Sequence, residues 1–201
     1  MSSYIPHSRK LPRDLENPID NYLIDLCEYF NPLFHKLKFT PNTLTTMSLF
    51  TGLFSIIFYL DNSYLISSIF LFISYWFDCT DGNYARTYNM VTKFGDYYDH
   101  VKDIIIYFSI FGLFLFDNNV NLIIKYFYFI VIVFLFILMS IHMSCQEDYY
   151  KHLNQPSSET LEYMKSFHDK IDASFLKYTR YFGCGTFYTI TSFLIFLLSF
   201  L

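Results

Sequence analysis

The chain has 201 residues, of which 53% are hydrophobic and 22% are aromatic. A water-soluble domain of this length cannot bury so much apolar surface, so the composition predicts an all-α, polytopic membrane bundle. The formal net charge of −4 and the lack of a basic run argue against nucleic acid as a partner.

The first 40 residues are expected to form an N-terminal segment outside the membrane core. Residues 1–18 are polar, whereas apolar side chains in residues 19–38 recur at helical spacing, namely Leu23, Leu26, Phe30, Leu33 and Leu37. This period predicts an amphipathic helix that lies in the membrane interface. Proline lacks a backbone N–H and clashes with the preceding turn, so Pro32 is expected to kink or divide that helix.

Residues 41–201 are expected to form one transmembrane domain with about five spans. Each apolar run is close to the ~20 residues that cross a bilayer as a helix. The expected spans are Leu44–Leu60, Tyr64–Tyr84, Phe94–Phe116, Val120–His142 and Tyr181–Leu201. The short polar links 61–63 and 117–119 are typical of turns between spans. Thr40 and Pro41 suit the N-cap and the first turn of the first span.

Basic residues predict the orientation of the domain. All of the 14 Lys and Arg residues except Lys125 lie on the opposite side from the two short links. Because cytosolic loops are enriched in Lys and Arg, the N-terminus and the polar segment 145–180 are expected in the cytosol, and Leu201 on the far side. Within that segment, Ser157 or Ser158 is a candidate N-cap for a further short helix.

Four aspartates stand where the second and third spans reach the cytosolic side. Asp78 and Asp81 are three residues apart and Asp99 and Asp103 are four apart, so each pair shares one helix face. Ionisable groups inside or beside spanning helices are costly and mark a functional site. Two such faces turned toward each other form a cage of oxygen atoms, which suits Mg²⁺ or Mn²⁺ rather than zinc or copper.

The residues around these aspartates resemble the signature of the CDP-alcohol phosphotransferase family, D-x2-D-G-x2-A-R-x8-G-x3-D-x3-D. All eight fixed positions match, at Asp78, Asp81, Gly82, Ala85, Arg86, Gly95, Asp99 and Asp103. The resemblance runs from about Asn17 to about Arg180, and Pro41–Thr45 is similar to the start of the family's first helix. It implies a membrane enzyme of phospholipid synthesis that transfers a substituted phosphate from a CDP-linked donor to an alcohol and releases CMP.

The resemblance also implies roles for single residues. Asp78, Asp81 and Asp99 would hold two divalent ions, Mg²⁺ or Mn²⁺, and Asp103 would act as general base while sharing one ion. The implied contacts to the nucleotide and pyrophosphate are Gly82, Ala85, Arg86, Asn42 and Thr45. Each of these has an alternative: helix–helix contact for the small residues, a membrane-edge anchor for the arginine, and helix capping for the other two.

The donor, the acceptor and the oligomeric state are less defined than the type of reaction. The donor is CDP-diacylglycerol or a CDP-amino-alcohol, and Tyr98–His100 is only faintly similar to the choline/ethanolamine branch. Lys93 and Arg180 are candidates for binding an acceptor phosphate, although ordinary cytosolic-side charges explain them equally well. The family usually has six spans, and a shortened last layer would weaken the contacts of a homodimer.

A non-catalytic membrane protein is the alternative reading, either an ion pathway or a decayed enzyme kept as a scaffold. An ion pathway would spread its carboxylates through the depth of the membrane, whereas these aspartates gather at one edge. A decayed enzyme would be expected to have lost at least one motif aspartate, and all four are present. The enzyme is therefore the favoured interpretation.

Overall fold

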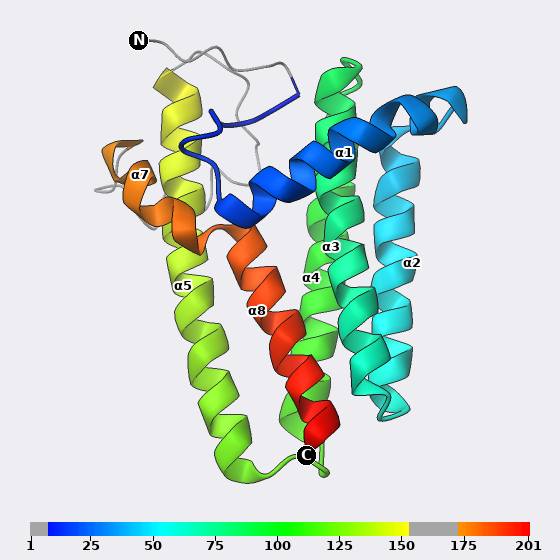
Figure 1. Cartoon of the computed structure of the whole chain (residues 1–201), viewed down its shortest axis with the longest axis vertical. Helices are drawn as coiled ribbons and strands as arrows, with labels where there is room; N and C mark the ends of the chain where they lie inside the picture. The colour runs from blue at the N-terminus through cyan, green and yellow to red at the C-terminus, as the bar shows by residue number, and fades with distance from the viewer. Residues whose placement is uncertain (1–7, 153–172) are drawn as a thin grey trace.

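The computed structural model describes residues 8–152 and 173–201, and this part of the chain is helical with no strand (Figure 1). The long helices are α1 (Pro18–Lys36), α2 (Pro41–Leu60), α3 (Tyr64–Thr87), α4 (Lys93–Phe116), α5 (Leu122–His152) and α8 (Cys184–Leu197). Short helical turns precede and follow α8, namely η1 (Ala173–Phe175), α7 (Leu176–Thr179), η2 (Arg180–Phe182) and η3 (Leu198–Phe200). The cap expected at Ser157 or Ser158 lies outside the described residues.

Helices α2, α3, α4, α5 and α8 run side by side, and α1 crosses one end of this bundle (Figure 1). Leu201 and both short links lie at the opposite end, as the alternation of spans and links predicts (Figure 1). The bounds of α2, α3 and α4 agree with the expected spans to within a few residues. Helix α5 differs, because it continues beyond His142 to residue 152 into a stretch that was expected to be a polar connection.

Three stretches of the described chain are long and apolar enough to cross a membrane, Pro41–Leu60, Leu122–Tyr149 and Leu176–Phe200. Helices α3 and α4 have 24 residues each, so they are also long enough, but they carry the charged motif residues. Those charges lower the mean hydropathy of both helices. The prediction of five spans therefore remains a prediction, supported by helix length and by the parallel arrangement in Figure 1.

Helix α1 is continuous through Pro32, so the expected division does not occur. Packing on either side of the proline keeps the helix in place: Asn31 donates to Asn83 on α3, and Phe34 is buried against Trp76. The exposed apolar stripe also differs from the expected one, and consists of Tyr22, Leu26, Tyr29, Leu33 and Leu37. Leu23 and Phe30 instead turn toward the bundle, because α1 lies on α3 and needs apolar residues on two faces.

Serine pairs bring α2 and α3 together. Each serine donates to the backbone carbonyl of its partner at 2.8 Å, and the pairs are Ser48 with Ser74 and Ser55 with Ser67. Small residues that hydrogen-bond across an interface are typical of helix contacts inside membranes. Helix α4 also packs closely on α2 at Gly52, where an added Cβ would lie 2.8 Å from Ile106. This close packing holds α3 and α4, the two helices that carry the motif, against α2.

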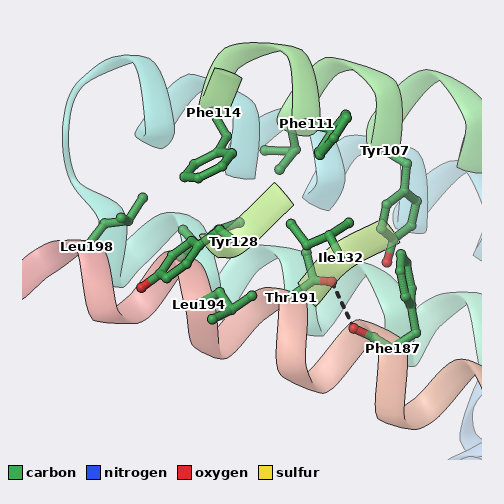
Figure 2. A pocket seen from close by; sticks show the side chains of 11 residues that line it. Tyr107, Phe111, Phe114, Tyr128, Ile132, Phe187, Thr191, Leu194 and Leu198 are labelled. Atoms are coloured by element: carbon green, nitrogen blue, oxygen red, sulfur yellow. Dashed lines mark hydrogen bonds between the residues drawn. The ribbon is translucent and has the colours of Figure 1, made fainter. Parts of the chain in front are cut away.

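The core between α4, α5 and α8 is apolar and contains one small space of about 30 Å³ (Figure 2). Phe114, Tyr128 and Leu194 are among its lining residues, and the Thr191 hydroxyl donates to the Phe187 carbonyl at its edge. A space of this size has room for only a few water molecules. The space is a packing gap, too small for a nucleotide or an acyl chain.

Candidate active site and metal centre

Helix α1 holds the motif-bearing end of α3 from one side. The Cys27 thiol lies 3.2 Å from the Thr80 hydroxyl, and the Asn31 amide donates to Asn83 at 2.6 Å. Thr80 and Asn83 are fully buried by these contacts. Because successive residues of a helix point in different directions, the aspartate-bearing face of α3 is left to meet α4.

Three of the four motif aspartates converge between α3 and α4. Asp78, Asp99 and Asp103 each offer a carboxylate oxygen, and the three oxygens lie within 4.8 Å of one another. All three side chains remain partly exposed, so a ligand can approach them. Like charges this close repel one another, so the cluster requires a positive partner.

Asp81 is held beside this cluster by α2. The Thr45 hydroxyl donates to its Oδ2 at 2.5 Å, and both side chains are buried. The Pro41 carbonyl oxygen lies 3.1 Å from the same Thr45 hydroxyl, within the first turns of α2, and shares its single proton. The described contact of this threonine is thus with a motif carboxylate, and the nucleotide role expected from the resemblance stays a prediction.

Lys102 is the site residue that the sequence reasoning missed, because it was counted only as a charge on the cytosolic side. Its ammonium makes ion pairs with Asp78, with Asp103 at 2.8 Å and with Asp99 at 3.1 Å. It also donates to the Ser48 hydroxyl on α2 at 3.1 Å. A signal was available, since Lys102 follows Asp99 by three residues and therefore shares its helix face.

Gly82 and Arg86 lie against each other one turn apart on α3. The Arg86 Nε donates to the Ser8 carbonyl at 3.0 Å, and its Nη1 would lie 3.2 Å from a Cβ added at Gly82. The glycine therefore makes room for the guanidinium, a role that neither sequence interpretation included. Ala85 is buried on the same end of α3, and its expected contact with the nucleotide is untested.

The first turn of α2 meets the first turn of α4. Thr40 caps α2 and forms a capping box with Thr43, as the sequence predicts for the cap. The neighbouring Asn42 Oδ1 would lie 3.2 Å from a Cβ added at Gly95. Gly95 thus permits close approach of the two helix starts, and this places Asn42 at the end of the bundle that carries the aspartates.

The family model for CDP-alcohol phosphatidyltransferase matches residues 38–198, which include all of the motif. The chain belongs to this family. A curated relative named bifunctional IPC transferase and DIPP synthase, from Aquifex aeolicus (strain VF5), is 35% identical over 97 residues. This match covers 48% of the chain but only 19% of the relative. No solved structure matches the chain.

Membership of the CDP-alcohol phosphatidyltransferase family confirms the resemblance and, with the apolar helices, identifies an integral membrane protein of the phospholipid-synthesis class. The cluster fits the divalent metal that the family uses. Its donors are carboxylate oxygens, which hard cations prefer, and the ammonium of Lys102 already lies among them as a cation. Asp78, Asp99 and Asp103 are therefore able to hold a metal ion in this family member.

A further buried carboxylate, Asp20 on α1, lies at the same end of the bundle. It accepts from the Tyr75 hydroxyl at 2.6 Å and from the Gly185 backbone N–H at 3.1 Å. Burial raises the pKa of Asp20 to about 6, against the lowering effect of these two hydrogen bonds. A Cβ at Gly185 would collide with the carboxylate, so the start of α8 needs glycine there.

The two candidates for an acceptor phosphate occupy different positions. Arg180 donates to the backbone carbonyl of Asp14, and its guanidinium lies 5.2 Å from the ring centroid of Tyr181. Lys93 is the first residue of α4. The described contacts of Arg180 tie η2 to the N-terminal segment, which is a structural role, and its phosphate-binding role stays a prediction.

Proposed function

We propose that this chain transfers a substituted phosphate group from a CDP-linked donor to the hydroxyl of an alcohol, with release of CMP. The observation that carries the proposal is the complete motif of the family, with three of its carboxylates from α3 and α4 gathered at one end of the bundle. The donor is CDP-diacylglycerol or a CDP-amino-alcohol.

In this proposal, Asp78, Asp81 and Asp99 hold two Mg²⁺ or Mn²⁺ ions, and Asp103 shares one of them. When bound, the ions neutralise the pyrophosphate and make the transferred phosphorus more electrophilic. Gly82, Ala85, Arg86, Asn42 and Thr45 are assigned to the donor side of the site. Support for Arg86 comes from its place beside Gly82, from which its Nη groups can reach a phosphate oxygen.

Asp103 is assigned as the general base. It lies one helical turn, roughly 6 Å, further along α4 than Asp99, on the bilayer side where a lipid or alcohol acceptor arrives. Its carboxylate takes the hydroxyl proton as the acceptor oxygen forms a bond to phosphorus. The bond from that phosphorus to the bridging oxygen breaks, and CMP leaves with the electron pair.

The reaction is tested with purified protein, radiolabelled CDP donors and a panel of acceptors that includes inositol, serine, glycerol phosphate and diacylglycerol. We expect CMP release with one donor class, full dependence on Mg²⁺ or Mn²⁺, and no release in excess EDTA. Full release in EDTA would contradict the metal assignment. Tight Mn²⁺ binding without release from any donor would instead favour the non-catalytic scaffold.

The cytosolic orientation of the site is part of the proposal. Thr87 is exposed at the end of α3, so a Thr87→Cys variant presents an accessible thiol at the motif end. In sealed cells we expect no reaction with an impermeant maleimide, and reaction once the cytosolic face is opened. The unmodified chain, in which Cys27 and Cys145 are buried, measures the background. Labelling from outside sealed cells would overturn the topology.

A further inference from the structure

The ammonium of Lys102 occupies the place of a cation in the carboxylate cluster. An ammonium group has three N–H donors. Nevertheless, four oxygens lie close to Nζ. One belongs to Asp78, and those of Asp99, Asp103 and Ser48 lie 2.8–3.1 Å from the nitrogen. Oxygens that outnumber the donors surround the nitrogen as they would surround a metal ion. The side chain is only 2% exposed, so this position is enclosed by the protein.

Lys102 reaches the cluster from the interior of the bundle, opposite to the exposed side of the carboxylates. Ser48, its partner on α2, is fully buried, and its own hydroxyl donates to the Ser74 carbonyl. The Ser48 oxygen is therefore free to accept from the ammonium. This contact gives Lys102 a fixed partner that is not a carboxylate.

A divalent ion and this ammonium need the same oxygens. Any ion bound by Asp78, Asp99 and Asp103 would lie within about 4 Å of Nζ, a separation at which like charges repel strongly in a partly buried site. The ammonium must therefore leave this position as the ion arrives, and it gives up its contact with Ser48 together with those to the three carboxylates.

We propose that Lys102 is an internal competitor for the metal site, which holds the carboxylates together before the ion binds and sets the ion concentration needed to displace it. The proposal rests on the proposed function, because it takes the motif aspartates as the metal ligands. It assigns to this chain a residue that controls metal affinity, beyond the ligands themselves.

The test is Mn²⁺ binding to the full-length protein in detergent, measured by electron paramagnetic resonance without any substrate. Lys102→Met keeps the length of the side chain and removes its charge. We expect Mn²⁺ affinity to rise by at least about tenfold, because the ion no longer displaces a cation. Thermal unfolding gives a second readout. In EDTA the variant should unfold at a lower temperature than the wild type, and added Mn²⁺ should raise the unfolding midpoint of the variant by more than that of the wild type.

Lys93→Met is the matched control, because it removes the same charge from the start of the same helix. Its Mn²⁺ affinity should stay within about threefold of the wild type, since a distant charge is screened. Equal or weaker Mn²⁺ binding by Lys102→Met than by the wild type would overturn the proposal. The proposal would also be overturned if neither the wild type nor Lys102→Met bound Mn²⁺.

Ser48→Ala tests the same competition if Lys102→Met does not fold. This variant keeps every charge and loses one of the four oxygens around Nζ, so Mn²⁺ should bind about two- to fivefold tighter. Unchanged affinity in a folded Ser48→Ala protein would count against the proposal. Failure of the proposed function gives a different pattern, with Mn²⁺ bound and competition measurable but no CMP released from any donor.

Discussion

Two groups of carboxylates lie at the same end of the bundle, and they are stabilised in opposite ways. Asp20 lies near the buried carboxyl of Glu16 and accepts from two neutral donors, the Tyr75 hydroxyl and the Gly185 N–H. The motif aspartates are a group of like charges around one ammonium, that of Lys102. The first arrangement is complete within the protein, whereas the second leaves a negative excess.

This difference indicates which carboxylates serve the fold and which serve a ligand. Buried polar groups in a stable fold are hydrogen-bonded within the protein. Asp20 fits this description, because its two donors connect α1 to α3 and to α8. A cluster with more negative than positive charge is costly unless a cation or a polar ligand completes it. Substitutions in the two groups should therefore change different quantities.

The largest effect is expected from Asp103→Asn. The amide keeps the shape and one acceptor oxygen but cannot take the hydroxyl proton, so turnover should fall by about 10²–10⁴-fold. Binding of the CDP donor with Mg²⁺ should stay nearly intact. The measurement is donor affinity beside CMP release, compared between this variant and the wild type.

Asp81→Asn is the companion variant, and it should weaken donor and metal binding as well as turnover. The contrast between the two variants separates a base from a ligand. Near-normal turnover of Asp103→Asn, or a loss of donor binding as severe as that of Asp81→Asn, would refute the division of roles.

Thr45→Val is expected to have an intermediate effect, because it removes the neutral donor to Asp81 and retains the shape of the side chain. Partners that orient metal ligands typically contribute about 10–100-fold to metal affinity, and we expect a loss of Mn²⁺ affinity in that range. Thr51→Val is the matched control, since its hydroxyl donates only to backbone carbonyls of α2 in the described contacts. Equal losses in both variants would show a general effect on the helix.

The helices were predictable because their signal is local. The runs that form α2, α3 and α4 are bounded by Thr40, by the link 61–63 and by the link 117–119, and each is long enough to cross a bilayer. The aspartate pairs were predictable for the same reason, since their spacing alone puts each pair on one helix face. Those predictions needed no knowledge of which helices are neighbours.

The partners of the site could not be predicted, because they depend on contacts between helices. The contact of Lys102 with Ser48 and that of Thr45 with Asp81 both require the position of α2 relative to α3 and α4. In the α1 stripe, Leu26, Leu33 and Leu37 were predicted correctly, but Leu23 and Phe30 were assigned to the wrong face because the period alone does not show that α1 packs on α3. Asp20 was passed over for the same reason, since its donors are distant in sequence.

The smallest effect is expected for Asp20→Asn, in the pH dependence of folding stability. It is also the sharpest check of the difference between Asp20 and the motif aspartates. Burial raises the folded-state pKa of Asp20 to about 6, above the ordinary value of an unfolded aspartate. A raised pKa means that the folded state binds the proton more tightly, so the stability from this group is lost as the pH rises through about 6. The amide does not titrate, so the variant lacks this loss.

Between about pH 5 and about pH 8, the stability of Asp20→Asn relative to the wild type should therefore rise by about 1–2 kcal/mol, read from thermal unfolding midpoints in detergent. Asp25→Asn on the same helix is the control, because Arg13 lowers the pKa of Asp25 and its titration falls below this window. Its difference from the wild type should be flat over the same range. Metal affinity should be unchanged in both variants, since neither carboxylate belongs to the cluster. A flat difference for Asp20→Asn, or a loss of Mn²⁺ binding, would break the distinction between a carboxylate that completes the fold and those that await a ligand.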